Sequence, residues 1–405
     1  MNILYLSQLI PYPPDAGPKV RIYHTLRYLS EAGHQVTLVA FEREGDDKRN
    51  IEHLRQICHD VHTVDIKRSQ TRDAHELIRS LVSNRPFLIS RDRVKDMHIK
   101  INELLGNNSF DAIHADQLWM AQYALIAGKE RANNGRLQMV LDQHNAVYLI
   151  PQRMSMNTSN PFKQLVLALE SRKLARYEVK TCQQFDRVVW VTEDDRQALT
   201  TIANGAGDFE KDLIIPICVD TETSQSLPPS DGAFRVTFLG GMHWPPNAQG
   251  IQWFFQNVWP IVQKRSPDSV LTVIGKNPPS SLRSAEDNPQ VEATGYVEDL
   301  SSYLQETAVF IVPLHSGGGM RVKIVDAWSW GLPVVSTAIG AEGITFDDGQ
   351  NILIADTPEE FADAVVSVLH NRELANQLSI NGRRSVETNY NWRKVYKLWD
   401  RVYPR

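Results

Sequence analysis

The sequence has few cysteines and no long apolar run. Its three cysteines, Cys58, Cys182 and Cys218, lie far apart and form no CxxC pair, which excludes a disulfide framework and a cysteine-based zinc site. No apolar run approaches the roughly 18 residues that a membrane-spanning helix needs. The N-terminus lacks the basic region of a signal peptide and meets a proline at Pro11. We therefore expect a cytoplasmic protein, with peripheral contact at the inner membrane face left open.

A strong excess of charge of either sign is also absent. The 43 basic and 48 acidic residues leave a net charge of −5, so no nucleic acid partner is expected. Glycine and proline are too scarce for a collagen-like or low-complexity chain, with 22 and 21 residues. The hydrophobic fraction of 42% is typical of soluble globular proteins. At 405 residues, the chain is long enough for two or three domains.

Short apolar runs alternate with segments of helical period along most of the chain. Residues 20–33 carry Ile22 and Leu26 at helical spacing, between apolar runs at 2–9 and 34–41. Further short runs without polar alternation are typical of parallel strands buried on both faces; they lie at 111–116, 137–144, 187–193, 235–241, 269–276, 291–297, 308–314 and 333–340. The pattern predicts an α/β fold with parallel sheets and crossover helices.

The alternation is interrupted once, by a segment rich in Pro, Ser, Thr and Asp at 214–234, which indicates a linker. We predict two Rossmann-like, doubly wound domains at 1–215 and 216–385. Residues 386–405 are expected to form an aromatic amphipathic helix that packs on either domain, with a return to the N-terminal one as one option.

The strongest candidate for chemistry is the segment after the strand 308–314. Three glycines, 317–319, are expected to open a helix over 320–331, with Arg321 and Lys323 in its first turn. Glycines let backbone N–H groups approach an anion, and a helix N-terminus favours phosphate. Without an anion, two cations at a helix N-terminus are unfavourable by about 0.3–1 kcal/mol. The alternative is a glycine turn before a solvated surface helix.

Several nucleotide-binding motifs are missing. The sequence has no GxxxxGK[ST] loop, no clear GxGxxG fingerprint and no Asp-x-Asp pair, which disfavours P-loop NTPases, dehydrogenases and a carboxylate-held metal–diphosphate. We expect no metal and no cofactor. Arg321, Lys323 and the helix N-terminus would supply the charge for a diphosphate, and Asp326 lies deep enough in the helix to reach a ribose.

Residues 315–337 resemble the signature of retaining glycosyltransferases with two facing Rossmann-like domains, the GT-B fold. They are most similar to glycosyltransferase family 4, whose signature is Glu-x7-Glu followed by Ala-x-x-x-Gly-x-Pro-Val-Val-x-Ser/Thr. The tail matches from Ala327 to Thr337, the second acid is Asp326, and the first falls on Gly318. The resemblance implies that Asp326 holds the ribose and that the usual acidic contact with the donor is lost at Gly318.

Other segments follow the order of the family along nearly the whole chain. The resemblance implies that Gly17 lies under the donor phosphates and that His144 is the active-site histidine near the anomeric carbon. It further implies that the backbone at Tyr296 and Val297 reads the base. Cys218 stands where the family motif that opens the C-terminal domain has glycine.

The segment FLGGMHWPPNAQG departs most from the family. The arginine and lysine that clamp the diphosphate in the family fall on Gly241 and Asn247. We interpret Arg321 and Lys323 as a relocation of these two cations.

The candidate residues therefore form two groups: those expected to act in catalysis or nucleotide binding, and further candidates, called peripheral residues below. A loop-capping role for His144 and turn or capping roles for the peripheral residues are the structural alternatives. The expected catalytic residues are His144, Arg321 and Lys323; the expected nucleotide-binding residues are Gly17, Gly317, Gly318, Gly319, Met320, Asp326, Tyr296 and Val297; further candidates are Lys19, His114, Asp116, His243 and Asn247.

One stretch of the sequence is basic, although the chain as a whole has a net negative charge. Residues 67–100 hold nine Lys or Arg and four Asp or Glu. A solvated face is the ordinary explanation for such a stretch. An anionic membrane or a lipid-diphosphate acceptor is the alternative; the basic residues include Arg68, Arg72, Arg79 and Lys95.

The resemblance implies a retaining transfer from a UDP- or GDP-linked sugar to a sugar, lipid-linked or protein acceptor, in glycan, polysaccharide or glycolipid synthesis. The N-terminal domain would bind the acceptor, the C-terminal domain the nucleotide, and the reaction would occur in the cleft. Two rivals stay open: a sugar-nucleotide epimerase of the same architecture, and a non-catalytic nucleotide-sugar-binding protein, which the missing acid at Gly318 suggests.

Overall fold

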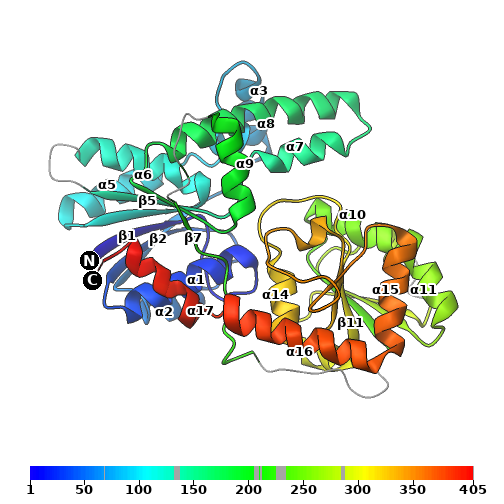
Figure 1. The fold of residues 1–405 in the computed structure, drawn as a ribbon. Helices are drawn as coiled ribbons and strands as arrows, with labels where there is room; N and C mark the ends of the chain where they lie inside the picture. The colour runs from blue at the N-terminus through cyan, green and yellow to red at the C-terminus, as the bar shows by residue number, and fades with distance from the viewer. Residues whose placement is uncertain are drawn as a thin grey trace. The chain divides into compact units, whose positions relative to one another are not determined.

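The computed structural model describes residues 1–67, 69–131, 137–204, 209, 212–224, 234–283 and 288–404. The chain forms two compact units (Figure 1). Unit 1 comprises Met1–Ile217 and Val395–Arg405, and unit 2 comprises Cys218–Lys394. The sequence-based boundaries are 215 and 385, and residues 225–233 of the predicted linker lie outside the described residues.

Unit 1 is built on a parallel sheet with the strand order β3-β2-β1-β4-β5-β6-β7. The order reverses between β1 and β4, which is where a doubly wound sheet binds its ligands. The strands of the described residues are β1 Asn2–Ser7, β2 Gln35–Glu42, β3 Asp60–Asp65, β4 Ala112–Asp116, β5 Gln138–Gln143, β6 Arg187–Trp190 and β7 Leu213–Ile214.

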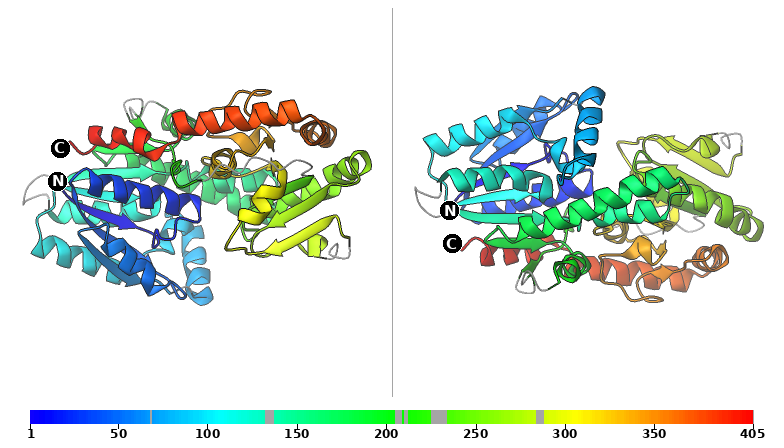
Figure 2. Two further views of the ribbon diagram at one scale, coloured as in Figure 1. Left: turned by 90° about the horizontal axis from the view of Figure 1, so that it is seen from below. Right: turned by 90° about the horizontal axis from the view of Figure 1, so that it is seen from above.

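Helices cover both faces of this sheet. α6 contacts β1, β4 and β5, and α1 lies on the opposite face beside the C-terminal 3-10 turn η3 Tyr396–Arg401 (Figures 1 and 2). The two chain ends lie side by side in unit 1. The described helices are α1 Gly17–Glu31, α2 Lys48–Arg55, α3 Gln70–Leu81, α4 Phe87–Ser90, α5 Lys95–Asn107, α6 Gln117–Arg131, α7 Leu149–Met156, α8 Pro161–Cys182 and α9 Glu193–Ala203.

Unit 2 repeats this plan with the strand order β10-β9-β8-β11-β12-β13. All its strand pairs are parallel, and the order reverses between β8 and β11. The strands are β8 Arg235–Leu239, β9 Val270–Ile274, β10 Val291–Gly295, β11 Thr307–Val312, β12 Val334–Ser336 and β13 Leu353–Ile354. The predicted pair of Rossmann-like domains is confirmed.

The helices of unit 2 pack around one apolar core. α15 contacts β11, β12 and β13, while α14 packs on α16. The elements of this unit, with the turns that follow them, are α10 Pro245–Trp253, the π-helical η1 Phe254–Val258, α11 Trp259–Arg265, α12 Ser280–Arg283, α13 Ser301–Glu306, α14 Val322–Ser329, η2 Ile339–Ala341, α15 Pro358–His370, α16 Arg372–Asn389 and α17 Trp392–Val395, which ends at the boundary with unit 1.

The helices expected over 20–33 and at the C-terminus differ from their prediction. The helix expected over 20–33 begins at Gly17, because Pro18 is suited to the first helical turn. The single helix expected at the C-terminus is wrong: α16 ends at Asn389, and the remainder forms the short α17 and the 3-10 turn η3. The Asn391 side chain accepts the Arg393 N–H and donates to Thr221, which ends the helical run before Trp392.

No helix within the described residues is long and apolar enough to cross a membrane.

Candidate functional site

The first group of candidate residues lies at the carboxyl ends of β8 and β11, where the strand order of unit 2 reverses. α10 follows β8 and α14 follows β11. The Lys323 Nζ of α14 donates a hydrogen bond of 2.9 Å to the Asn247 Oδ1 of α10. A Cβ at Gly240 would lie only 2.9 Å from this Nζ. The ammonium group therefore reaches the loop in which the family resemblance expects an arginine and a lysine.

Glycine is required where the strand ends of unit 2 approach one another. Gly275 follows β9 with φ 148°, and a Cβ there would lie 2.1 Å from the Gly240 carbonyl oxygen. Its N–H donates to the Gly295 carbonyl at 2.7 Å. The carboxyl ends of β8, β9 and β10 are thus held together through backbone contacts.

Lys323 and Asp326 lie one helical turn apart, and both are half-buried. Burial and the neighbouring Arg321 lower the pKa of Lys323 to about 7, against the opposing effect of Asp326. Burial raises the pKa of Asp326 to about 7, against the opposing effect of Lys323. Among the described residues Lys323 forms no ion pair within 4.0 Å; its closest polar partner is the neutral Asn247. A bound anion would therefore favour the charged form of this lysine.

The glycine loop before α14 is braced by Arg321. Gly319 has φ 74°, a conformation that favours glycine, and turns the chain toward the helix. Arg321 caps α14, which begins one residue later at Val322. Its Nη1 donates to the carbonyls of Gly318 and Gly319 at 2.8 and 3.1 Å.

Arg321 has two further partners beyond the loop. Its Nε donates to the Ile339 carbonyl at 3.3 Å, and its Nη2 lies 3.6 Å from a Glu342 carboxylate oxygen. Arg321 thus fixes the loop in this structure, and its direct contact with a phosphate stays a prediction. Met320, beside it, is buried.

The other candidates of unit 2 lie around the same edge. Asn247 was interpreted as a helix cap, which is wrong: α10 begins at Pro245 after the cap residue Trp244, and the Asn247 Nδ2 donates to the Gly241 carbonyl. His243 is exposed, with its ring against Gly241. Tyr296 and Val297 directly follow β10.

The Tyr296 ring is 60% exposed. The Lys276 Nζ lies 4.6 Å from the ring centroid. A cation–π contact of this length steadies an aromatic face that is open to solvent.

The second group of candidate residues is buried in unit 1, at the carboxyl ends of β4 and β5. Its centre is an ion pair between Arg21 of α1 and Asp142 of β5, both fully buried. Two hydrogen bonds of 2.8 and 3.0 Å join the guanidinium to the two carboxylate oxygens. The Arg21 Nη1 also donates to the carbonyls of Ile215 and Pro216. Arg21 therefore ties α1, β5 and the end of unit 1 together.

His144 directly follows β5 and lies beside two carboxylates. Its Nε2 is 2.9 Å from Asp116 Oδ1 and 3.8 Å from Asp142 Oδ2. Burial alone would lower the pKa of His144, but Asp116 and then Asp142 outweigh it and raise the pKa to about 9. At neutral pH the imidazole is therefore protonated and acts as a hydrogen-bond donor.

His114 lies in the same layer and has the opposite character. Burial lowers the pKa of His114 to about 3, so the ring is neutral. Its Nδ1 is 2.7 Å from the Tyr403 hydroxyl, and its ring stacks on Tyr5 at 4.1 Å. These contacts give His114 a packing role that connects the C-terminal residues to the sheet.

The loop after β5 is held by two buried carboxylates. Glu178 of α8 accepts the N–H groups of Val147 and Tyr148 at 2.9 and 3.2 Å, and Asp195 of α9 accepts that of Ala146 at 2.8 Å. Burial raises the pKa of Glu178 to about 8 against these hydrogen bonds. The loop that carries His144 is thus fixed from two helices.

Gly17 is the first residue of α1, with its N–H at the helix N-terminus. Lys19, two residues later, forms an ion pair of 2.9 Å with Asp15. Since this pair is partly exposed, its stabilising energy is small, about 0–1 kcal/mol.

A metal site is a further possibility for the unit 1 cluster. Oxygen and nitrogen atoms of His114, Asp116 and Asp142 lie within 4.8 Å of one another. The donor set does not suit a cation well, because Arg21 occupies both oxygens of Asp142 and His144 neutralises Asp116. Adding a divalent ion would require displacement of these buried positive charges.

Sequence reasoning missed Arg21, Asp142 and Glu178. For Arg21 a signal was available: it stands between Val20 and Ile22 in a helix with an apolar face, and a buried charge needs a partner. The identity of that partner, 121 residues away, carries no local signal.

Comparison with known proteins relates the chain to glycosyltransferases. The profile of glycosyltransferase family 4 matches residues 16–223, and that of glycosyl transferases group 1 matches residues 233–371. An uncharacterized 44.6 kDa protein in the cps region of Klebsiella pneumoniae is 23% identical over 407 residues, covering 98% of both chains.

Two solved structures have the same fold. Anabaena HepE in complex with UDP is similar with a TM-score of 0.69 and 14% identity, over 100% of this chain and 99% of that one. A mutant of S. aureus TarM in complex with fondaparinux, alpha-GlcNAc-glycerol and UDP has a TM-score of 0.64 and 11% identity, over 100% of both chains. These identities support the fold alone.

Proposed function

Since the chain belongs to glycosyltransferase family 4, we propose that it moves a sugar from a nucleoside diphosphate to a hydroxyl acceptor with retention of the anomeric configuration. The observation that carries the proposal is Lys323, a half-buried cation at the switch point of unit 2 whose closest polar partner is the neutral Asn247. The UDP and UDP-glucose complexes of Anabaena HepE support a donor of this class.

Unit 2 binds the donor in this proposal. Lys323 and the N–H groups of the 317–319 loop take the diphosphate, and Asp326 accepts the ribose hydroxyls. As the glycosidic bond breaks, negative charge develops on the leaving diphosphate, and preorganised donors stabilise that charge. No enzymic nucleophile is assigned, and the leaving diphosphate assists deprotonation of the acceptor on the same face of the sugar.

Unit 1 binds the acceptor, and His144 contributes from it to the sugar side of the reaction. Asp116 and Asp142 keep the imidazole protonated. The Nδ1 of His144 has no hydrogen-bond partner among the described residues, so it is the atom that donates to a sugar hydroxyl. His144 is therefore a donor and not a general base at neutral pH.

The diphosphate site works without a metal in this account. Lys323 supplies the charge that a cation would otherwise bring, and the sequence has no Asp-x-Asp pair. Transfer should persist in excess EDTA. Loss of transfer with EDTA and recovery with Mg²⁺ or Mn²⁺ would contradict this part of the proposal.

The biosynthetic role is proposed more coarsely, as polysaccharide or glycolipid synthesis. The relative from the K. pneumoniae cps region, which matches over 98% of both chains, supports it.

The test is a screen of UDP- and GDP-linked sugars by thermal shift, followed by transfer assays and proton NMR of the product. A ligand at 100 times its dissociation constant stabilises by about 2.7 kcal/mol, which is readily detected. We expect one donor to stabilise the chain and the product to keep the anomeric configuration of the donor. Inversion would contradict the retaining assignment, an epimer formed without acceptor would identify an epimerase, and tight UDP binding without turnover would identify a binding protein.

A further inference from the structure

The long helix α8 has an exposed face that is apolar in its first half and basic in its second. Phe162, Leu165 and Leu169 are 74%, 59% and 38% exposed, and the three basic side chains that follow them are exposed as well. Residues three or four apart lie on one side of an α-helix, so these side chains form one ridge. We call this ridge the α8 face; it consists of Phe162, Leu165, Leu169, Arg172, Arg176 and Lys180.

The far side of α8 attaches the helix to unit 1. Leu174 and Ala175 are buried there, and the Ser171 hydroxyl donates to the Tyr148 carbonyl at 3.0 Å. α8 also packs along α7, with which it forms a hairpin (Figures 1 and 2). The contacts that hold α8 in place therefore come from residues outside the α8 face.

The cations of the α8 face lack the acidic partners that other exposed helix cations have. Arg55 and Arg79 each lie within 4.0 Å of a glutamate three residues earlier. Among the described residues, no cation of the α8 face forms such an ion pair. The two acids of α8 bond elsewhere: Glu170 accepts the Leu88 N–H at 3.0 Å, and Glu178 accepts N–H groups of the loop after β5. Three uncompensated positive charges thus lie beside three exposed apolar side chains.

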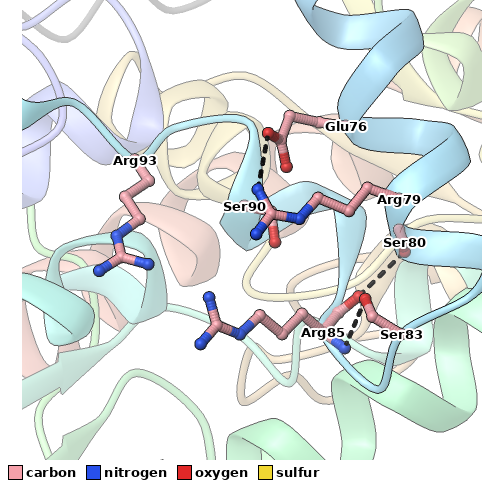
Figure 3. A pocket seen from close by; sticks show the side chains of 7 residues that line it. All are labelled: Glu76, Arg79, Ser80, Ser83, Arg85, Ser90 and Arg93. Atoms are coloured by element: carbon pink, nitrogen blue, oxygen red, sulfur yellow. Dashed lines mark hydrogen bonds and ion pairs between the residues drawn. The ribbon is translucent and has the colours of Figure 1, made fainter.

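The basic stretch 67–100 borders α8 without covering this face. The Lys173 Nζ of α8 donates to the Ser80 carbonyl at the end of α3. The pocket in this stretch is lined by seven polar side chains, none of them from α8, and Arg79 points to Glu76 (Figure 3). The α8 face is therefore a ridge beside this pocket and not one of its walls. An exposed ridge suits an extended surface, whereas small ligands bind in concave sites.

A second copy of this chain would not supply the missing negative charge through the same face. Two α8 faces packed antiparallel would place the cations of each helix on the apolar half of the other. Packed parallel, they would place cations against cations. An anionic bilayer offers what the face lacks, because its acyl boundary accepts apolar side chains and its phosphates attract Lys and Arg.

We propose that the α8 face binds the surface of an anionic lipid bilayer. The helix lies in the plane of the surface, its apolar half enters the boundary between headgroups and acyl chains, and its basic half contacts lipid phosphates. This binding does not rest on the proposed function. If the chain is the transferase proposed above, it works beside the bilayer, and its acceptor belongs to the lipid-linked class.

The test is flotation of the full chain with vesicles of phosphatidylcholine and phosphatidylglycerol, compared with vesicles of phosphatidylcholine alone. We expect binding that rises with the fraction of phosphatidylglycerol and falls with salt. Leu165→Ser should weaken binding about 10-fold or more, because an inserted apolar side chain is lost. Arg176→Glu should weaken it by a similar factor, since two charges change and each changes the affinity about five-fold.

The helix α16 offers matched control variants. Ile380 is 59% exposed, and Arg384, one turn later, is exposed as well. Ile380→Ser and Arg384→Glu make comparable changes in apolar surface and charge on another helix, and they should stay within about two-fold of the parent chain. Since all four positions are exposed, the free energy of unfolding should change little. Urea denaturation verifies that each variant is folded.

Three results would overturn the proposal. The first is no binding to vesicles, or equal binding to both kinds of vesicle. The second is equal weakening by the α8 and α16 variants, which would indicate general surface charge. The third is a parent chain that dimerises in light scattering and becomes monomeric with Leu165→Ser, because the occupant of the face would then be a second copy.

Failure of this proposal and failure of the proposed function give different results. With a lipid-linked acceptor in phosphatidylglycerol vesicles, Arg176→Glu should raise the KM several-fold and leave kcat unchanged; with a soluble acceptor, neither should change. If the chain binds vesicles but no donor supports transfer, only the proposed function fails. If transfer proceeds but no vesicle binds, only the assignment of the α8 face fails.

Discussion

The two candidate sites differ in how their charges are balanced. In unit 1, Arg21 and Asp142 form a fully buried ion pair, and His144 lies against Asp116. In unit 2, Lys323 is half-buried, bonds to a neutral amide, and has a pKa lowered to about 7. The first site is balanced internally, whereas in our proposal Lys323 of the second site receives its counter-charge from the bound diphosphate.

This difference assigns the two sites different tasks. A balanced buried network holds side chains in fixed positions and contributes to folding, because removal of one member leaves an uncompensated charge. A desolvated cation without a counter-charge lowers the stability of the free protein, and binding of an anion restores that stability. Substitutions in unit 1 should therefore change stability, and substitutions in unit 2 should change ligand affinity.

The largest effect is expected for Arg21→Ala. The change leaves Asp142 buried without its partner and should lower the free energy of unfolding by about 3–5 kcal/mol. Urea denaturation followed by circular dichroism measures it. The control is Lys19→Ala, two residues earlier, whose exposed pair with Asp15 should contribute less than about 1 kcal/mol. Equal effects of the two variants would show that the buried pair is not a structural centre of unit 1.

The next effect concerns His144 and pH. Its folded pKa of about 9 lies above the ordinary value of 6.5. The stabilisation of the folded chain by protonated His144 is therefore fully present below pH 6.5 and is lost as pH rises through 9. Its size is on the order of 3 kcal/mol. We expect the difference in unfolding free energy between the parent chain and His144→Gln to shrink from pH 6 to pH 9.5. A difference that is constant with pH would mean that the imidazole is not held protonated.

His144→Ala also distinguishes the two sites in function. Because the imidazole acts on the sugar side, the variant should lose most transfer activity and keep its affinity for UDP within a few-fold. Steady-state assays and calorimetry measure the two properties. Full transfer by the variant, or loss of UDP binding, would contradict the role proposed for Nδ1.

Much of the fold could be predicted from the sequence, because parallel strands buried on both faces leave short apolar runs that are easy to recognise. Local turns were harder. The helical period of residues 248–265 predicts one regular helix, but η1 inserts a π turn at Phe254–Val258. Pro260 explains it: proline lacks the N–H and crowds the carbonyl four residues earlier.

The site was predicted unevenly for a physical reason. Lys323 and Asp326 could be chosen because glycines and a helix start identify them locally. Glu178 could not be chosen, since α8 carries many charged residues and only its packing shows which one is buried. The pairing of Arg21 with Asp142 depends on tertiary structure alone.

A smaller effect is expected for Lys323→Met in unit 2. The variant should bind UDP about 10- to 150-fold more weakly, corresponding to the loss of about 1.5–3 kcal/mol of charge-assisted hydrogen bonding. Its stability should not fall, because the free protein no longer holds a desolvated cation. Lys264→Met, at an exposed lysine of α11, is the control. A variant that unfolds easily but binds UDP normally would place Lys323 in the same class as Arg21.

The smallest effect is expected for Asp326→Asn, which keeps the shape and one acceptor oxygen. We expect UDP affinity to fall by a few-fold, about 1 kcal/mol, since a carboxylate accepts hydroxyls more strongly than an amide does. Affinity for inorganic pyrophosphate should be unchanged, because no ribose is present. Calorimetry with both ligands gives the comparison, and equal losses for both would exclude the ribose role.

The central claim is that Lys323 is a diphosphate cation that awaits its anion, and proton uptake tests it most directly. At pH 8, a lysine with a pKa of about 7 is mostly neutral, while Asp326, also near 7, is already ionised. UDP binding should raise the pKa of Lys323, so close to one proton should be taken up per UDP. Calorimetry in buffers of different ionisation enthalpy measures this number. We predict nearly one proton at pH 8 for the parent chain and clearly fewer for Lys323→Met, in which only Asp326 can take up protons; UDP binding without proton uptake, or the same uptake in both proteins, would contradict the claim.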